Sequence, residues 1–331
     1  MTEHAADARQ VMAFYKFVAA PPAAGLPQVQ DELQTLSESL GVKGTILLAD
    51  EGINGTVVAS RDALKQLRAA MDQHFGPVPV KYSELDADNQ GFYRLKVRIK
   101  PEIVSFGVPD LDVANTGEHV SAQRWNELLA DPNVVVIDTR NTYEIDIGTF
   151  PGAVSPETES FREFPAWVQD NLDPKQTPRV AMFCTGGIRC EKASAFMRQQ
   201  GFDEVYQLDG GILQYLEDVP EQDNTWQGEC FVFDQRVSVN AALEQGQYKQ
   251  CYACRHPITA DDMASPAFEL GVSCPHCIDS GAGHTDPTRT ERLRERQKQV
   301  ELAVSRGEQH IGTHQKARKT RVSPGAGGAE E

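Results

Sequence analysis

Two short apolar runs, each ending at a polar or glycine-bearing loop, constrain the fold of this chain most strongly. VVVID occupies residues 134–138 and RVAMF occupies residues 179–183. Such runs are typical of strands that are covered on both faces in a parallel sheet. In an open α/β sheet, the loops at the carboxyl ends of the strands form the functional site. We therefore expect an α/β domain over residues 119–220, with its site at the loop after residue 183.

That loop begins with a cysteine and contains two consecutive glycines, an arginine and the start of a helix. A cysteine attacks only as its thiolate, and a pKa of about 8.5 leaves an ordinary thiol mostly protonated at neutral pH. Backbone N–H groups in a glycine loop and at the start of a helix favour an anion. We therefore predict that the cysteine is reactive. The loop residues are Cys184, Thr185, Gly186, Gly187, Ile188 and Arg189.

Other interpretations of this loop are weaker. An inert buried cysteine is common, but it does not explain the combination of strand, cysteine, glycines, arginine and helix. A cysteine phosphatase wraps phosphate with Cys-x5-Arg, whereas Cys184 and Arg189 form Cys-x4-Arg, one residue short. Cys190 either packs the first helical turn or resolves an oxidised Cys184, and we favour packing.

The preceding residues, 11–107, alternate between strand-like and helix-like patterns. Apolar runs at 11–18, 44–49, 56–60, 78–85 and 94–100 predict strands, with helices at 28–40 and from residue 60 or 62 to about 74 and a turn at 50–55. This order predicts a ferredoxin-like α+β domain. Residues 108–118 are interpreted as a linker. Lys96, Arg98 and Lys100 could contact RNA, but we expect a solvated basic face because alternating charges on a strand usually form one.

Residues 221–284 form a third region, with a strand-like run at 230–239 and four cysteines in two Cys-x2-Cys pairs separated by nineteen residues. This spacing is typical of a structural zinc site, whose closed tetrahedral shell stabilises the fold without catalysis. His256 and His276 are less favoured ligands, and a small core of reduced cysteines without metal is the alternative. The predicted Zn²⁺ ligands are Cys251, Cys254, Cys274 and Cys277.

Charge is distributed unevenly along the chain. The net charge is −16, which argues against coating nucleic acid with the whole surface, and no DNA partner is expected. Residues 285–322 nevertheless carry ten Lys or Arg against five Asp or Glu. We expect a basic helix and disordered tail over residues 285–331, where phosphate contact and a solvated helix are equally good interpretations, and disorder at residues 1–10.

The chain lacks features of an exported or membrane protein. No apolar run approaches the ~20 residues needed to cross a bilayer, and the first residues do not resemble a secretory signal. The seven cysteines are an odd number with two Cys-x2-Cys pairs, which fits a reducing compartment better than a disulfide framework. We therefore expect a cytoplasmic protein with no membrane partner.

Residues 138–144 (DTRNTYE) and 148–153 (GTFPGA) resemble the rhodanese signature. In that resemblance, Asp138 begins the motif, and Arg140 and Glu144 organise the entrance of the domain. A structural salt link between Arg140 and Glu144 is as good an interpretation as a direct catalytic role.

A wider set of segments resembles the bacterial tRNA uridine hydroxylase family over about residues 10–300. The resemblance implies oxygen-dependent conversion of uridine to 5-hydroxyuridine at wobble position 34 of tRNA, with dioxygen as co-substrate and Cys184 as the catalytic residue. It identifies no electron donor. The matching segments are EGINGT at 51–56, KVRIKPEIVSFG at 96–107, CTGGIRCEK at 184–192, LDGGILQYLE at 208–217, GECFVFDQRVSV at 228–239 and GVSCPHC at 271–277.

The chemistry of a thiolate is compatible with this activity. Addition of Cys184 to C6 of uracil would make C5 nucleophilic; alternatively, the cysteine carries a persulfide or an oxidised sulfur. A thiosulfate or persulfide sulfurtransferase is the main competing function, but a stand-alone rhodanese needs neither the N-terminal domain nor the four cysteines. A binding adaptor with a degenerate rhodanese fold is a third alternative, against which the intact Cys184 and Arg189 argue.

Overall fold

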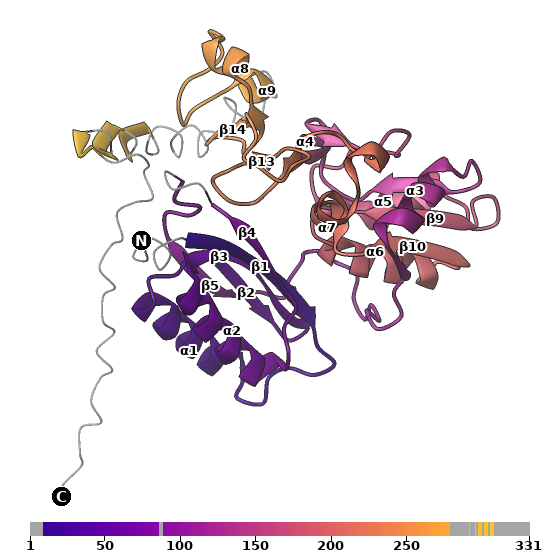
Figure 1. The fold of residues 1–331 in the computed structure, drawn as a ribbon, viewed down its shortest axis with the longest axis horizontal. Coiled ribbons are helices and arrows are strands. Elements are labelled where there is room, and N and C mark those ends of the chain that lie inside the picture. Colours follow the sequence, from indigo (N-terminus) through magenta and orange to yellow (C-terminus); the bar gives the residue numbers. More distant parts are fainter. Residues whose placement is uncertain are drawn as a thin grey trace, which may run out of the picture.

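The structure is a computed structural model that describes residues 9–85 and 89–278 and, in the C-terminal helix, residues 291, 295, 297–299, 301–303 and 305–307. The predicted tail and most of the predicted N-terminal disorder lie outside the described residues. Two α/β domains lie side by side, and a third, cysteine-containing part lies at one end of both (Figure 1). Among the described residues, no helix has the length and apolar character required to cross a membrane.

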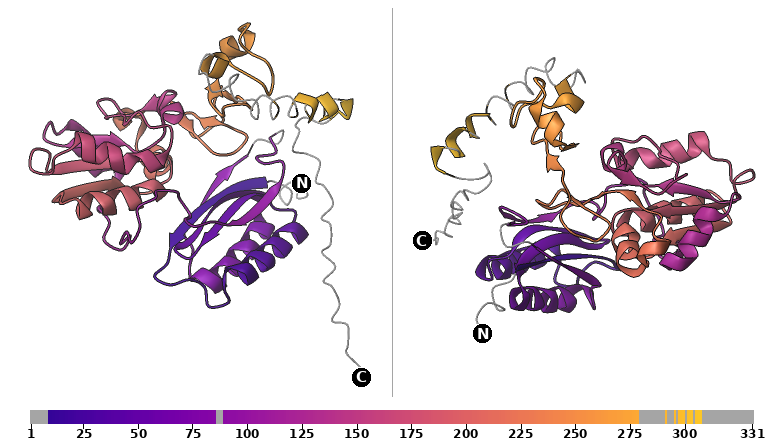
Figure 2. Two further views of the ribbon diagram at one scale, coloured as in Figure 1. Left: turned by 180° about the vertical axis from the view of Figure 1, so that it is seen from behind. Right: turned by 45° about the horizontal axis from the view of Figure 1, so that its top comes forward.

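The N-terminal domain is the predicted ferredoxin-like sandwich. Its sheet has the strand order β4-β1-β3-β2-β5, in which β5 runs parallel to β2 and the other neighbours are antiparallel. Both helices cover the face turned away from the second domain (Figures 1 and 2). The elements are β1 (Arg9–Phe17), α1 (Leu26–Ser39), β2 (Lys43–Ala49), β3 (Gly52–Ser60), α2 (Arg61–Phe75), β4 (Val80–Glu84) and β5 (Leu95–Ile99).

Strand alternation divides this sheet into a core face and an open face. Met12 and Phe14 of β1 pack in the helix-side core, so the next side chain, Tyr15, points to the other face. Ser60 caps the start of α2, because its hydroxyl accepts the N–H of Ala63 at 3.4 Å. The predicted turn at 50–55 was too long, because pairing with β1 extends β3 back to Gly52.

The second domain is built on a parallel sheet of order β6-β10-β9-β7. Apolar side chains cover both faces: Phe183 belongs to one core and Met182 to the other. The elements are β6 (Glu118–Val120), α3 (Ala122–Ala130), β7 (Val135–Asp138), α4 (Thr142–Ile145), β8 (Gly148–Thr149), η1 (Phe161–Glu163), α5 (Phe164–Asn171), β9 (Arg179–Phe183), α6 (Ile188–Gln199), β10 (Glu204–Leu208), α7 (Gly211–Asp218) and η2 (Glu221–Asp223).

The two domains meet earlier in the chain than residue 107, where the sequence placed the boundary. Phe106 is 1% exposed and packs against Phe161, Phe164 and Phe196 of the second domain. Similarly, Trp226 lies in the core of the second domain, although the sequence assigned it to the cysteine-containing region. Aromatic side chains in both connecting segments therefore anchor them to this domain.

The remaining described residues form short hairpins and the cysteine module, defined here as residues 249–278. The predicted strand-like run at 230–239 is wrong as a single strand, because it folds back on itself with Val237 at φ +67°. The elements are β11 (Gln227–Gly228), β12 (Cys230–Phe231), β13 (Ser238–Val239), β14 (Lys249–Gln250), β15 (Pro257–Ile258), α8 (Ala260–Ala264) and α9 (Pro275–Ile278).

Candidate active site

Cys184 follows β9 directly and lies in a cradle of backbone N–H groups. The Gly187 N–H donates a 3.1 Å hydrogen bond to its sulfur, and the N–H groups of Arg189 and Cys190 are directed at the same atom. Gly187 adopts φ +95°, a conformation that favours glycine and turns the chain into α6. The loop therefore brings the backbone donors to the sulfur, as the sequence predicted.

The surroundings of Cys184 favour its thiolate. Burial opposes ionisation, but the Cys190 thiol, the Arg189 charge and the N–H groups of Cys190 and Arg189 outweigh it and lower the pKa of Cys184 to about 6. Burial and the nearby Cys184 raise the pKa of Cys190, so Cys190 remains a thiol and can donate its proton to the thiolate. Its role is thus more specific than packing alone.

A second glycine-bearing turn braces the cysteine loop. The N–H of Ile212 donates to the carbonyl oxygen of Cys184 at 2.9 Å, and the N–H of Leu213 donates to that of Thr185 at 3.1 Å. Gly211 has φ +66°, and a Cβ there would lie 2.4 Å from the Cys184 oxygen. Only a residue without a side chain allows this close approach.

The charge of Arg189 is held by a buried carboxylate. Its guanidinium donates to both oxygens of Glu144, at 2.6 and 2.7 Å, and Glu144 is fully buried. Burial opposes the charge on Glu144, but Arg189 lowers the pKa of Glu144 below its ordinary value. Because both terminal nitrogens of its guanidinium are engaged by Glu144, Arg189 fixes the loop to α4.

Asp138 and Arg140 form a second buried pair under the loop. Arg140 donates to the two Asp138 oxygens at 2.8 and 2.6 Å and to the carbonyl oxygen of Gly148 at 2.6 Å. Its side chain is 0% exposed. The salt link between Arg140 and Glu144, one of the two interpretations considered, does not form between these side chains: Arg140 donates to the carbonyl oxygen of Glu144 at 3.2 Å. Both acidic side chains instead pair with different arginines.

The N-terminal domain reaches the cysteine loop through Tyr15. Its hydroxyl donates a 3.0 Å hydrogen bond to Glu191 in α6. A Cβ on Gly187 would lie 2.9 Å from the hydroxyl oxygen of Tyr15. Burial, followed by the charges of Glu191 and Cys184, raises the pKa of Tyr15. His119 lies 3.2 Å from the same Glu191 oxygen, which raises the pKa of His119.

Two further features mark the side from which a substrate could approach. A Cβ on Gly186 would meet no atom within 4 Å. Phe233 is 56% exposed, although it is a large apolar residue, and its ring lies 5.9 Å from the Arg189 guanidinium carbon. Cys184 itself is only 1% exposed, so its sulfur lies just beneath the surface of the loop.

Sequence reasoning missed Tyr15, Glu191 and Phe233 as members of this site. Glu191 follows the cysteine loop, and helical geometry could have placed it near the loop. Tyr15 lies in a strand of another domain, and only domain docking brings it to the loop. Phe233 was assigned to a strand, where an exposed phenylalanine is not unusual.

The four cysteines of the module lie together, as predicted. Their sulfur atoms are all within 4.8 Å of one another, with Cys274 at 3.7 Å from both Cys254 and Cys277. Tetrahedral zinc with Zn–S bonds of about 2.3 Å requires sulfur atoms about 3.8 Å apart. The donor set and its spacing therefore fit Zn²⁺.

The two histidines considered as substitute ligands have other partners. His256 lies 3.3 Å from Asp146, and His276 lies 3.4 Å from Asp262. Their rings stack on each other at 4.4 Å. The four cysteines are therefore sufficient to hold a metal such as zinc, in a closed shell suited to a structural role.

Comparison with protein families agrees with this architecture. Residues 9–103 match the UPF0176 acylphosphatase-like domain, and residues 121–218 match the rhodanese-like domain. The fold and the cysteine loop define a rhodanese-domain protein, with a sulfurtransferase-like or tRNA-modifying role. The chain joins these two domains in this order, which is the architecture of the UPF0176 (tRNA uridine hydroxylase) family.

Individual solved structures resemble single domains of the chain. The human single-domain sulfurtransferase TSTD1 is 22% identical with a TM-score of 0.27, over 31% of this chain and 99% of that one. The rhodanese-like domain of Anabaena sp. Alr3790 is 18% identical with a TM-score of 0.27, over 33% of this chain and 78% of that one. An acylphosphatase from Coxiella burnetii is 13% identical with a TM-score of 0.21, over 30% of this chain and 100% of that one. These values are too low for any inference about activity.

Proposed function

We propose that this protein hydroxylates uridine at wobble position 34 of tRNA to 5-hydroxyuridine, with dioxygen as co-substrate and Cys184 as the reactive residue. The observation that carries the proposal is the Cys184 thiolate, with a pKa of about 6, in a chain that has the two-domain architecture of the UPF0176 family. At neutral pH such a cysteine is mostly ionised and can act as a nucleophile. The substrate would be met in the cytoplasm.

The thiolate would activate the base by addition. A sulfur lone pair forms a bond to C6 of uracil, and the C5–C6 π electrons move toward C5 and the O4 carbonyl. C5 then accepts one oxygen atom of dioxygen; two electrons from a thiol-class reductant and two protons convert the other oxygen atom to water. Loss of the C5 proton and departure of the Cys184 thiolate restore the double bond. Overall, uridine, dioxygen, two electrons and two protons yield 5-hydroxyuridine and water.

Residues of this chain would hold the sulfur through that sequence. The N–H groups of Gly187, Arg189 and Cys190 stabilise the thiolate when it is released. The Cys190 thiol supplies a further donor to the sulfur. The open side at Gly186 leaves space for a flat base to approach, and the exposed ring of Phe233 is available to stack on it.

A sulfurtransferase is the second candidate, favoured by the same open side of the loop. Attack of the Cys184 thiolate on the outer sulfur of thiosulfate would form a persulfide and release sulfite. A nucleophile such as cyanide would then take the outer sulfur as thiocyanate and regenerate the thiolate. The N–H cradle suits a persulfide anion as well as a thiolate.

Nucleoside analysis of tRNA separates the two candidates. In cells that lack this protein, we expect loss of 5-hydroxyuridine derivatives, restored by the wild type and not by Cys184→Ser. Unchanged 5-hydroxyuridine, together with sulfite release from thiosulfate that depends on Cys184, would instead support the sulfurtransferase. Addition to C6 is tested separately by mass spectrometry with tRNA containing 5-fluorouridine: intact binding without a covalent adduct would contradict it.

A further inference from the structure

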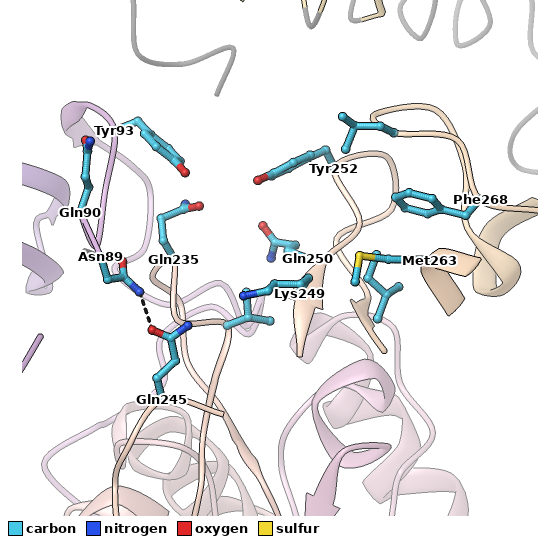
Figure 3. Close-up of a pocket in the computed structure, with 13 residues that line it drawn as sticks. Asn89, Gln90, Tyr93, Gln235, Gln245, Lys249, Gln250, Tyr252, Met263 and Phe268 are labelled. Carbon is cyan, nitrogen blue, oxygen red and sulfur yellow. Dashed lines mark hydrogen bonds between the residues drawn. The ribbon is translucent and has the colours of Figure 1, made fainter. Parts of the chain in front are cut away.

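A cleft separates the N-terminal domain from the cysteine module, away from the Cys184 loop. Its volume is about 620 Å³, within the range of small-molecule sites. The segment around Asn89 and Tyr93 forms one wall, and residues of the module form the other (Figure 3). Asn89 donates a 2.9 Å hydrogen bond to Gln245 at the base of the cleft, which ties the two sides together. Cys184 does not line this cleft.

Two tyrosines face each other across the opening. Tyr93 projects from the N-terminal domain and Tyr252 from the module, with their hydroxyl groups turned toward each other (Figure 3). Both aromatic rings are partly buried and partly exposed, as a stacking platform for an unpaired base requires.

The polar lining of the cleft suits the edge of a base. Amide side chains at Gln235 and Gln250 lie below the two rings, and Gln90 lies beside Tyr93 (Figure 3). The Gln250 oxygen accepts a 3.0 Å hydrogen bond from Arg255. Each amide both donates and accepts hydrogen bonds, as nucleobase edges do. Among the described residues that line the cleft there is no Asp or Glu, while Lys249 contributes a cation. The lining therefore presents hydrogen-bonding groups without a negative charge to repel a phosphate.

Several cations lie close in sequence to the two tyrosines. Arg94 follows Tyr93 and precedes β5, which carries Lys96 and Arg98, whereas Arg255 lies three residues after Tyr252 in the module. Burial and the charges of Arg94, Arg98 and Arg255 lower the pKa of Lys96. Within the part of the chain that the structure describes, none of the four forms an ion pair. Like charges gathered without acidic partners, in a chain of net charge −16, indicate a site for an external anion.

We propose that this cleft binds an unpaired segment of the RNA substrate, with a base between Tyr93 and Tyr252 and the adjoining phosphates on Arg94, Lys96, Arg98 and Arg255. The inference rests on the proposed function and adds a second contact with the tRNA, distinct from the Cys184 loop. An acidic peptide would use the cations but would leave the facing rings and amides without matching groups. RNA uses all three features together.

The cysteine module holds half of this site. Tyr252 lies between Cys251 and Cys254, and Arg255 follows Cys254 with φ +78°. The N–H of Arg255 donates to the carbonyl oxygen of Cys251 at 2.8 Å, which closes the turn. A metal on the four sulfur atoms would therefore fix one tyrosine and one cation of the RNA site.

Fluorescence anisotropy with a labelled tRNA anticodon stem-loop and the full chain tests this inference. Tyr93→Leu and Tyr252→Leu should each raise the Kd about 5- to 150-fold, the range expected for loss of one base–aromatic stack. The corresponding Tyr→Phe variants keep the ring and should remain near the wild-type Kd. Tyr82→Leu is the matched control, because Tyr82 is exposed and pairs with Met12 of the helix-side face. Tyr93→Leu does not alter the module, so it reports on stacking even if Tyr252→Leu disturbs the fold.

The contribution of the cations to phosphate binding is measured by the salt dependence of the Kd. Replacing Lys96 or Arg98 with Gln should reduce the slope of log Kd against log salt by about one for each phosphate that the variant no longer binds. Wild-type affinity in Tyr93→Leu, no RNA binding by the wild type, or displacement of the RNA by an acidic peptide at equal charge concentration would overturn the inference.

Cellular 5-hydroxyuridine and stem-loop affinity together distinguish failure of the cleft inference from failure of the proposed function. If 5-hydroxyuridine depends on the protein in cells while Tyr93→Leu binds and modifies tRNA like the wild type, only the cleft inference fails. If the tyrosine variants lose stem-loop affinity but 5-hydroxyuridine persists without the protein, the hydroxylase proposal fails and the RNA cleft stands.

Discussion

The hydroxyl of Tyr15 donates a 3.0 Å hydrogen bond to Glu191, and this bond joins the two α/β domains at the cysteine loop. Glu191 lies one residue after Cys190 in the first turn of α6. Lys192, the next residue, forms 2.8 Å ion pairs with Glu51 and Glu102. The start of one helix therefore carries both the donors of the thiolate cradle and the contacts that position the N-terminal domain.

Tyr15→Phe should destabilise the protein by about 1.5 to 3 kcal/mol, because it removes a hydrogen bond to a charged group and leaves Glu191 less well paired. Urea unfolding measures the change. Tyr82→Phe is the control, since the exposed Tyr82 should alter stability by no more than about 0.5 kcal/mol. Equal effects of the two substitutions would show that the Tyr15 contact does not stabilise the interface.

The reactivity of Cys184 should depend on pH through its lowered pKa. Because the thiolate reacts, the rate of alkylation at Cys184 should rise with pH, reach half its maximum near pH 6 and level off above about pH 7. Mass spectrometry of the Cys184 peptide measures this rate. Cys190→Ala removes a donor and should move the midpoint to higher pH, whereas Cys190→Ser keeps a donor and should move it less. A wild-type midpoint near 8.5 would contradict the proposed cradle.

Glu144→Gln should cost about 3 to 5 kcal/mol of unfolding free energy, because it leaves the buried Arg189 charge without its carboxylate. Denaturant unfolding provides the measurement. Glu127→Gln is a matched control: Glu127 pairs with Arg124 at 2.6 Å, but both side chains are about half exposed. Loss of the Arg124–Glu127 ion pair should change the free energy of unfolding by no more than about 1 kcal/mol. A cost for Glu144→Gln as small as the control's would rule out a structural role for the buried pair.

The sequence was most informative where local pattern and chemistry coincide. VVVID and RVAMF predicted buried strands, which the structure pairs side by side, and the glycines after residue 183 predicted the N–H cradle around Cys184. The spacing of the two cysteine pairs similarly predicted the four-sulfur cluster. In each case the residues that meet are close in sequence or follow adjacent strands.

Prediction was weaker where partners come from distant segments. The contact of Tyr15 with Glu191 joins residues 176 positions apart, and no local period encodes it. A structural salt link was one of two interpretations for Arg140 and Glu144, and tertiary folding gives each a different partner. Lys96 was expected on a solvated face, yet burial and the charges of Arg94, Arg98 and the distant Arg255 lower its pKa.

Gly211→Ala should destabilise the cysteine loop by more than the backbone cost of φ +66°, because the added Cβ would lie 2.4 Å from the Cys184 oxygen. Gly201→Ala isolates the backbone cost: its φ is +91°, and no atom lies within 4 Å of the added Cβ. We expect about 1 to 2 kcal/mol for Gly201→Ala and a larger loss for Gly211→Ala, measured by unfolding. Slower alkylation of Cys184 should accompany Gly211→Ala and not Gly201→Ala. Equal losses would indicate that the loop moves to accommodate the methyl group.

The four cysteines should hold one zinc ion per chain, because their sulfur spacing matches a tetrahedral site. Metal analysis of the purified protein measures the content, and less than ~0.3 zinc per folded chain would contradict the site. Cys254→Ser should lose the metal, whereas Cys230→Ser, which changes a buried cysteine outside the cluster, should retain it. Chelation should also raise the Kd for the anticodon stem-loop, since Tyr252 and Arg255 would no longer be fixed. Alkylation of Cys184 should be unaffected, because that loop is held by Glu144, Gly211 and the start of α6, so a chelator that changed both properties equally would indicate general unfolding.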